Sequence, residues 1–381
     1  MKIGIDARWI FKELSGIGTY TLELIRHLAQ GDRRNEYVLF FQDRTLEQSV
    51  RQTAQLEKAP NFTSHILPYG VFSLPNQLLL PRQLHRLNID VFHSTNFMIP
   101  FAAFPRSRKG RTRCVTTIHD LIPLLFPEYA PRSRKTRVYP LYRRLMLEVA
   151  ARSSIVLTDS ENSRQDIVKS LGFSHTDSRR VQAAPIGVSS QFRPSLVQRP
   201  SPPMLLYVGR MDPYKNVEGV LRVLKHARAL SGQDVRLTVI GPPDDRYPSP
   251  LDLARRHGME PFVHWAGYLP ADQLLDTYQQ ARVLLLLSRY EGFGLPVLEA
   301  MACGTPVVCS NTSSLPQVAG QAALLTNPDD VEAAAAAVVR ILTEPALAQD
   351  LRDKGLRQAA AFTWVHTARQ TLRAYEQAYK S

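Results

Sequence analysis

The chain of 381 residues, 44% hydrophobic and 21% charged, has the composition of a soluble globular protein with two domains, which excludes the disordered and fibrous classes. Its three cysteines, Cys114, Cys303 and Cys309, have neither short paired spacings nor a neighbouring histidine cluster, so we exclude a disulfide framework and a zinc site and expect all three in the core. The formal net charge of +13 is unevenly distributed, since eleven basic and two acidic residues lie between Phe104 and Arg144.

This basic block, Arg106 to Arg144, suits a partner that carries phosphate, such as an anionic membrane surface, a lipid diphosphate or nucleic acid. A solvated basic face is the alternative. No nucleic-acid-binding module accompanies the block, so we expect no nucleic acid as partner. No stretch approaches the roughly 20 apolar residues that span a bilayer, and the chain opens with a strand-like run instead of a signal peptide. We therefore expect a cytoplasmic protein, peripheral at the inner face of the cell membrane if the block binds lipid.

Strand-like runs alternate with helix-like runs along the first half of the chain, which predicts a doubly wound α/β domain. The expected strands are Lys2 to Ala7, Tyr37 to Phe41, Ser64 to Leu67, Val91 to His93, Cys114 to His119, Ile155 to Thr158 and Val181 to Ala184. The expected helices are Gly18 to Ala29, Asn76 to Leu87, Lys135 to Ala151 and Asn162 to Leu171. Ser160 is the predicted N-cap of the last helix.

A proline-rich segment, Phe192 to Pro203, interrupts the alternation and is predicted to be an interdomain linker. The alternation then restarts as a second α/β domain. Its expected elements are Leu205 to Val208, Asn216 to Leu230, Arg236 to Ile240, Leu251 to Arg256, Val263 to Trp265, Ala271 to Gln280, Val283 to Leu287, Pro296 to Ala302, Pro306 to Cys309, Ala323 to Leu325, Val331 to Leu342 and Ala346 to Ala361. A last helix, Trp364 to Tyr379, closes the chain. We place the first domain at residues 1–191, the linker at 192–203 and the second domain at 204–361, with ligands bound in a cleft between the carboxyl ends of the two sheets.

Two motifs of the first domain follow expected strands. Gly16 and Gly18 come after the first strand and open a helix, so their amides can face a phosphate, although a simple turn is the alternative. His119 and Asp120 end the strand that begins at Val115 and therefore point at the cleft. A lone histidine is more often a core or surface residue, so this position is what suggests a role.

In the second domain, Arg210 and Lys215 bracket a turn made by Asp212 and Pro213, directly after the first strand. Arginine can bind a phosphate with two donors and lysine adds a point charge, so the pair suits a diphosphate. Ordinary surface cations beside a turn are the alternative. Asn216 is the predicted N-cap of the helix that follows.

The apolar run Val283 to Leu287 is typical of a strand buried on both faces, and it leads into Glu291-Gly292-Phe293-Gly294-Leu295-Pro296-Val297-Leu298-Glu299. The two glycines let backbone amides approach a ligand, and Pro296 suits the first turn of a helix whose N-terminus attracts phosphate. Carboxylates would repel that phosphate, so we expect Glu291 and Glu299 to bind sugar or ribose hydroxyls. The alternative is that Glu299 only satisfies the first turn of its helix and Glu291 is solvated.

Together these motifs, with Cys303-Gly304-Thr305-Pro306-Val307-Val308, resemble the retaining glycosyltransferases of family 4 over essentially the whole chain. The resemblance implies the GT-B fold, which consists of two Rossmann-like doubly wound α/β domains facing a cleft. It also implies that the first domain binds the acceptor, that the second binds the nucleotide sugar, and that a C-terminal helix, residues 362–381, packs back toward the first domain.

The resemblance implies roles for the motif residues. Glu291 would lie near the donor sugar and Glu299 on the ribose hydroxyls of the nucleotide. Arg210 and Lys215 would bind the diphosphate and neutralise it as it departs. The donor would also meet the backbone of the segment formed by Gly292, Phe293, Gly294, Leu295 and Pro296.

In the first domain, the amides of Gly16 and Gly18 would approach the distal phosphate and the acceptor, and His119 would contact sugar hydroxyls through its backbone or its ring. Retention of configuration is implied, with the leaving phosphate taking the acceptor's proton. Asp120 is the nearest candidate for a covalent nucleophile. Neither a metal nor a cofactor is implied, because the cations are side chains and the nucleotide sugar is a co-substrate.

The stretches Thr117 to Leu124 and Asp159 to Ser163 are similar to bacterial mannosyltransferases that build cell-surface polysaccharide such as lipopolysaccharide. We therefore expect transfer of a hexose, with mannose from GDP-mannose favoured, to a glycan or a lipid-linked oligosaccharide. One alternative is a nucleotide-sugar epimerase of the same fold. The other is a catalytically silent nucleotide-sugar-binding subunit. Such a subunit would not need all four of the charged residues Arg210, Lys215, Glu291 and Glu299.

Overall fold

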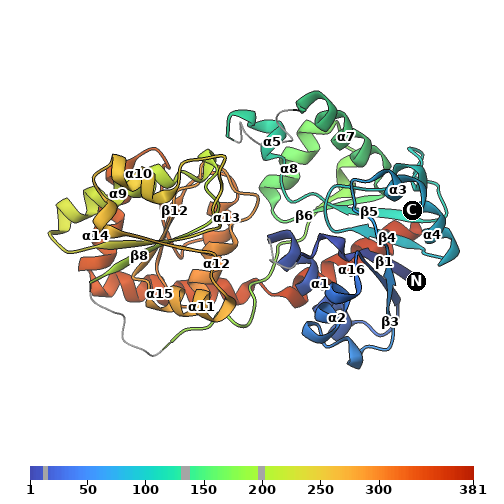
Figure 1. Cartoon of the computed structure of the whole chain (residues 1–381), viewed down its shortest axis with the longest axis horizontal. Helices are drawn as coiled ribbons and strands as arrows, with labels where there is room; N and C mark the ends of the chain where they lie inside the picture. Colours follow the sequence, from blue (N-terminus) through green and yellow to red (C-terminus); the bar gives the residue numbers. More distant parts are fainter. Residues whose placement is uncertain (12–15, 130–137, 196–201) are drawn as a thin grey trace. The chain divides into compact units, whose positions relative to one another are not determined.

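The computed structural model describes residues 1–11, 16–129, 138–195 and 202–381, and these divide into two compact units (Figure 1). The first unit is built from the described parts of Met1–Leu124, Val138–Gly187 and Trp364–Ser381. The second is built from the described parts of Val188–Thr363 together with residues 125–129. Part of the predicted linker, the predicted helix start at Lys135 and the basic residues at positions 132, 134, 135 and 137 lie outside the described ranges.

A parallel sheet forms the centre of the first unit, with the described strands in the order β3-β2-β1-β4-β5-β6-β7. These are β1 (Lys2–Asp6), β2 (Glu36–Phe41), β3 (Phe62–Ile66), β4 (Val91–Ser94), β5 (Arg113–Thr117), β6 (Ile155–Thr158) and β7 (Val181–Ala183). The described α-helices are α1 (Gly16–Gly31), α2 (Arg44–Thr53), α3 (Leu74–Leu78), α4 (Leu80–Arg86), α5 (Ile122–Leu125), α7 (Tyr139–Arg152), α8 (Glu161–Ser170) and α16 (Trp364–Lys380). Helices α1, α2 and α16 lie on one side of this sheet, and α7 and α8 lie on the other (Figure 1).

The second unit has a parallel sheet in the order β10-β9-β8-β11-β12-β13. Its strands are β8 (Met204–Val208), β9 (Arg236–Ile240), β10 (Val263–Gly267), β11 (Val283–Leu286), β12 (Val307–Ser310) and β13 (Leu324–Thr326). Its α-helices are α9 (Val217–Ser231), α10 (Pro250–Arg256), α11 (Ala271–Gln280), α12 (Leu295–Ala302), α13 (Leu315–Ala319), α14 (Val331–Thr343) and α15 (Pro345–Ala361). Helices α9 and α10 cover one face, and α11, α12 and α15 cover the other (Figure 1).

Both sheets have the strand order of a doubly wound Rossmann-like fold, so the predicted fold class is confirmed for each unit. The direction of winding reverses between β1 and β4 in the first sheet and between β8 and β11 in the second. Loops leave the neighbouring strands in opposite directions at such a switch point, which opens a crevice at the carboxyl ends. The residues that follow β8 and β11 therefore occupy the position where this fold binds ligands.

Helix α16 belongs to the first unit and packs on its sheet. The helix turns a face of small side chains inward, which lets its backbone approach the strands. The buried small residues on this face are Thr367, Ala368, Thr371, Ala374 and Ala378. Its one large buried tyrosine, Tyr375, has its hydroxyl 2.7 Å from Nδ1 of the buried His93 on β4. These contacts tie the last helix of the chain to the first sheet.

Several local predictions hold and one fails. Ser160 and Asn216 cap α8 and α9, accepting from the amides of Ser163 and Gly219. All three cysteines are free and buried, as predicted. The predicted helix from Asn76 to Leu87 is wrong, because the structure has two helices, α3 and α4. Pro81 lacks the N–H that would continue one helix through this point.

Helix α2 is absent from the sequence prediction because its surface is almost entirely polar. Leu46 and Val50 are the only apolar residues of its ten, and Val50 is the only buried one, so the apolar side is too short to identify a helix. Asp43 caps its N-terminus by accepting from the amide of Leu46, and this cap was the available signal. Among the described residues, no helix combines the length and the apolar character that a membrane span requires.

Candidate functional site

The centre of the candidate site is an ion pair between the loops that follow β8 and β11. Lys215 Nζ lies 2.7 Å from both carboxylate oxygens of Glu291, and the Ser288 hydroxyl donates to Glu291 Oε1 at 2.7 Å. The side chains of Lys215 and Glu291 are 14% and 9% exposed. The structure thus brings together two predicted site residues that stand 76 positions apart. The suggestion that Glu291 is simply solvated is wrong.

The loop that carries Lys215 is held by Arg289. The backbone amide of Arg289 donates to the Tyr214 carbonyl at 2.7 Å, and its guanidinium donates to the Pro213 carbonyl at 3.2 Å and to Asp329 at 2.7 Å. These bonds fix the short 3-10 helix Pro213–Lys215 from outside. The position of the Lys215 ammonium is therefore set by the fold before any ligand arrives.

Arg210 lies in a separate cluster of charges on the same loop. Its Nε donates to Asp212 at 2.8 Å, and its terminal nitrogen lies 3.9 Å from Asp244. Arg246 pairs with Asp244 at 2.6 Å and lies 3.7 Å from Asp212. The Arg246 guanidinium, through its hydrogen bonds, holds the pKa of the Asp244 carboxyl below its usual range. Arg210 is 56% exposed, so it can turn toward an anionic ligand by exchanging one carboxylate partner for another.

Asp244 and Arg246 were not singled out from the sequence. They follow β9, whose carboxyl end lies at the same edge of the sheet as that of its neighbour β8. Their position directly after a parallel strand could have indicated a site at this edge of the sheet. The loop that carries them has no glycine motif, however, so its sequence does not differ from that of an ordinary connection.

Packing and hydrogen bonds within the second unit fix the conformation of the glycine loop after β11. Gly294 has φ +107°, and a Cβ there would lie 2.6 Å from Leu315 Cδ2, so both the backbone and the space require glycine. The Ser314 hydroxyl donates to the carbonyls of Glu291 and Phe293 at 2.9 and 2.7 Å. The loop carbonyls are thereby turned inward, while helix geometry leaves the Leu295 amide without an intrahelical acceptor.

Phe293 is buried and packs edge-on against Phe362, with ring centroids 5.9 Å apart. Its side chain therefore belongs to the core, and only its backbone remains for a ligand. Pro296 lies in the first turn of α12, as the sequence predicts. Leu295 and Pro296 are half-buried at the start of this helix, and Gly292 precedes them in the same loop.

Glu299 lies on α12, one turn beyond Leu295 and on the same face. The Tyr278 hydroxyl donates to Glu299 Oε2 at 2.7 Å, and within the described residues Oε1 has no hydrogen-bond partner. Burial, partly offset by the Tyr278 hydroxyl, raises the pKa of Glu299 to about 7. The first turn of α12 contains no acidic residue, so the suggestion that Glu299 only satisfies that turn is wrong.

The predicted residues of the first unit lie at the carboxyl edge of its own sheet. Gly16 is the first residue of α1, Gly18 is buried in the first turn, and a Cβ on Gly16 would meet no atom within 4 Å. His119 lies two residues beyond the end of β5 and is half-buried. Asp120 accepts from the amide of Ile122 at 3.0 Å, so one oxygen of its carboxylate is engaged at the start of α5.

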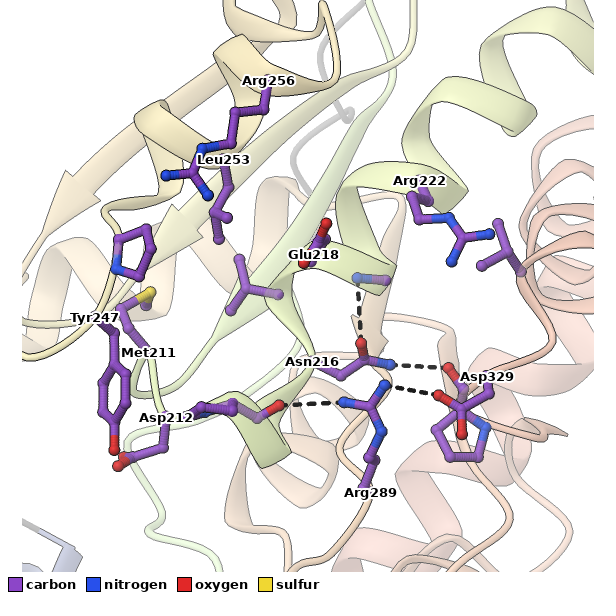
Figure 2. A pocket seen from close by; sticks show the side chains of 16 residues that line it. Met211, Asp212, Asn216, Glu218, Arg222, Tyr247, Leu253, Arg256, Arg289 and Asp329 are labelled. Carbon is purple, nitrogen blue, oxygen red and sulfur yellow. Dashed lines mark hydrogen bonds and ion pairs between the residues drawn. The ribbon is translucent and has the colours of Figure 1, made fainter. Parts of the chain in front are cut away.

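Figure 2 shows the side chains that line a cavity beside the loop Gly209 to Asn216, and the volume of this cavity is about 320 Å³. Asn216 contributes to its wall and donates to the Pro328 carbonyl at 2.8 Å, and Arg289 lies beside it. The ionisable lining residues balance in charge. They are Arg222, Arg256 and Arg289 with Asp212, Glu218 and Asp329. No residue predicted to bind the donor lines this cavity, although Asp212, which pairs with Arg210, and Arg289, which holds the loop of Lys215, contribute to its wall.

Residues 14–191 match the family model described as Glycosyltransferase Family 4, and residues 188–358 match the model described as Glycosyl transferases group 1. The O-antigen chain mannosyltransferase B of Escherichia coli is 30% identical over 99% of this chain and 100% of its own length.

Two solved structures share the fold. Sucrose-phosphate synthase from Thermosynechococcus elongatus has a TM-score of 0.75 at 21% identity, covering 100% of this chain and 99% of its own. HepE of Anabaena, solved in complex with UDP and glucose, has a TM-score of 0.73 at 16% identity, covering 98% of each chain.

Proposed function

The chain belongs to glycosyltransferase family 4 and has the GT-B fold, and from this we propose that it transfers mannose from GDP-mannose to a glycan or a lipid-linked oligosaccharide with retention of configuration. The observation that carries the proposal is its likeness, over the full length of both chains, to an O-antigen chain mannosyltransferase. That the chain is a glycosyltransferase follows from its family; the donor, the sugar and the stereochemistry are what is proposed.

The geometry of the second unit supports a nucleoside diphosphate sugar as donor. Lys215 and Arg210 provide two cations at the carboxyl edge of the sheet, and the start of α12 provides an oriented amide dipole. When the bond between the sugar and the phosphate breaks, negative charge grows on the departing diphosphate. Cations that are already held in place stabilise this charge without having to reorganise, which lowers the barrier.

In this proposed reaction, Glu291 positions the side chain of Lys215. Its carboxylate holds the Lys215 ammonium from one side, and the Ser288 hydroxyl holds the carboxylate from another. The sugar hydroxyls of the donor would donate to Glu291, and the ribose hydroxyls to Glu299. The acceptor hydroxyl attacks the anomeric carbon as the bond to phosphate breaks, and a phosphate oxygen on the same face takes its proton. This sequence accounts for retention without a covalent nucleophile.

Incubation of the purified chain with GDP-mannose and a mannose-terminated oligosaccharide tests the proposal. One mannose should be added to the acceptor for each GDP released, and UDP-, ADP- and dTDP-sugars should be poorer donors. Without acceptor, the sugar of GDP-mannose should not be converted into another sugar. Rapid interconversion in that control would instead identify an epimerase, and donor binding without any turnover would identify a silent binding subunit.

We further propose that the basic block holds the protein to an anionic membrane surface. Several of its members are already engaged within the protein. Arg106 pairs with Glu148, Arg108 lies 3.7 Å from Asp177, and Arg113 donates to nearby backbone carbonyls. Arg143 and Arg144 are exposed on α7 and Lys109 is exposed as well, so these three are the described members best placed for a lipid surface. Each basic side chain near such a surface contributes about 1 kcal/mol.

The chain is therefore expected to float with vesicles of phosphatidylglycerol and phosphatidylcholine at low salt and to be released at high salt. Replacing Arg143 and Arg144 together by glutamate should reduce flotation severalfold. The matched control replaces two exposed arginines of the second unit, Arg222 and Arg256, and should float like the unchanged chain. If the unchanged chain does not float at low salt, the membrane proposal is wrong.

A further inference from the structure

His119 joins the loops that follow three adjacent strands of the first sheet, β4, β5 and β6. Its ring nitrogen Nδ1 lies 2.7 Å from Asp159 Oδ2, directly after β6, and Nε2 lies 3.1 Å from the carbonyl oxygen of Thr95, directly after β4. The edge of the Tyr20 ring from α1 packs against the imidazole, with centroids 4.9 Å apart and planes at 83°. The ring is therefore held from three sides.

The two partners of the imidazole determine its protonation state. A carboxylate and a backbone carbonyl can only accept hydrogen bonds, so both ring nitrogens must carry a proton. Only the imidazolium cation has two N–H groups. Burial is the largest single effect and works against this charge, but the attraction and hydrogen bond of Asp159, with smaller contributions from Asp120 and the Thr95 carbonyl, together raise the pKa of His119 above its ordinary value.

Asp159 is equally dependent on His119. Its side chain is buried, and within the described residues its second oxygen, Oδ1, has no hydrogen-bond partner. A buried carboxylate without a compensating charge is strongly destabilising, so the ionised Asp159 side chain depends on the positive charge of His119. Within the described residues, the imidazolium is the one cation that contacts this carboxylate.

The other titratable groups around His119 do not replace this partner. Asp120, its chain neighbour, adds a weaker attraction and uses one oxygen to cap Ile122. Tyr20 is buried, and burial raises its pKa, so it is neutral. His93, buried on β4, has its pKa lowered to about 3 by burial and by His119, so it is neutral as well. Asp159 is thus the main group that stabilises the positive charge on His119.

We propose that Asp159 is a positioning residue of the transferase, which holds His119 as an imidazolium between the loops after β4 and β6 and so fixes the backbone around His119 against which the sugar binds. The inference rests on the proposed function. Because both ring nitrogens are engaged, the group left to meet sugar hydroxyls is the backbone of this segment. Loss of the proton would break one of the two contacts and release the loop.

The titration of His119 tests the ion pair without any enzyme assay. In the full chain with isotope-labelled histidine, the His119 ring is assigned by its disappearance in His119→Gln. It should carry both protons at pH 6.5. In Asp159→Asn its pKa should fall, since the main attraction that opposes burial is then gone, and Asp159→Glu should restore part of the shift. A neutral His119 at pH 6.5 in the unchanged chain would overturn the proposal.

Asp32→Asn is the matched control. Asp32 is also a buried carboxylate of the first unit, accepting from the Tyr37 hydroxyl at 2.6 Å and from the Asn35 amide at 2.7 Å. Its loss should lower the melting temperature in the same way as Asp159→Asn but leave the titration of His119 unchanged. Equal shifts of the His119 titration in both variants would mean a general loosening of the unit, and the specific role of Asp159 would be wrong.

The positioning role is read from the pH dependence of transfer. Activity should fall on the alkaline side as His119 loses its proton, and in Asp159→Asn this limb should move to lower pH with kcat reduced roughly tenfold to a hundredfold. Asp159→Glu should move it part of the way back. An unmoved limb in Asp159→Asn, with the His119 titration shifted, would overturn the role. If the unchanged chain itself transfers no sugar while His119 titrates as stated, the failure belongs to the proposed function.

Discussion

Replacement of Lys215 by alanine is expected to lower the rate of mannose transfer at least tenfold while the chain still folds. Lys215 contributes the half-buried cation that pairs with Glu291, and removing one preorganised charge from a transition state typically costs about a hundredfold or more in rate. The fold should survive because the side chain is not part of the apolar core, and Glu291 retains the Ser288 hydroxyl at 2.7 Å. Some loss of melting temperature is expected from the unpaired carboxylate.

Two further variants sharpen this result. Lys225, an exposed lysine on α9, is the matched control, and Lys225→Ala should transfer at the normal rate. Glu291→Gln should restore melting temperature to Lys215→Ala without restoring activity, because it removes the unpaired charge but adds no cation. A normal transfer rate in Lys215→Ala, at saturating donor, would show that the diphosphate is stabilised elsewhere.

Replacement of Glu299 by alanine is also expected to reduce transfer at least tenfold, here through weaker donor binding, and the effect should depend on pH. With its pKa raised to about 7, the Glu299 carboxyl is mostly protonated at pH 6 and mostly ionised at pH 8. The ribose hydroxyls are donors, so they bind better to the ionised form. Affinity for the donor should therefore rise roughly tenfold between pH 6 and pH 8, following the ionised fraction.

Thermal stabilisation by GDP-mannose measures this directly, since a ligand that binds only the native state raises its melting temperature. The rise should be larger at pH 8 than at pH 6 in the unchanged chain, and small at both in Glu299→Gln. Tyr278→Phe removes the hydroxyl that stabilises the ionised form, so the pH dependence should move to higher pH. The same stabilisation at both pH values in the unchanged chain would remove Glu299 from the ribose site.

The fold could be predicted closely from the sequence because both sheets are parallel and buried. The strand Val283–Leu286 is an unbroken run of fully buried residues, and such runs can be located by composition alone. Helix α2 and the break between α3 and α4 could not be predicted in this way. The first has only two apolar residues, Leu46 and Val50, and the second depends on a single proline inside a periodic run.

Single residues of the candidate site could be predicted from the sequence, but the contacts between them could not. The motifs identify Lys215 and Glu291, but no spacing indicates that residues 76 positions apart form an ion pair. Tyr278, which donates to Glu299, comes from an amphipathic helix that resembles any other. The roles of these residues toward a donor, like those of Arg210 and His119, stay predictions.

His119 illustrates why the chemistry of a site needs coordinates. The sequence suggested that its ring or its backbone contacts a sugar. The distances to Asp159 and Thr95 show that both ring nitrogens already have acceptors, and contact of the backbone with a sugar stays a prediction. Similarly, the charge of the basic block was countable from the sequence, but its pairing with residues such as Glu148 and Asp177 was not.

The anomeric configuration of the transferred sugar tests the central claim most directly. GDP-mannose carries its mannose in the α configuration, and the acceptor product can be examined by NMR as soon as it forms. The account predicts an α-linked mannose, added only when acceptor is present. A β-linked product, or efficient transfer from UDP-glucose with none from GDP-mannose, would contradict it.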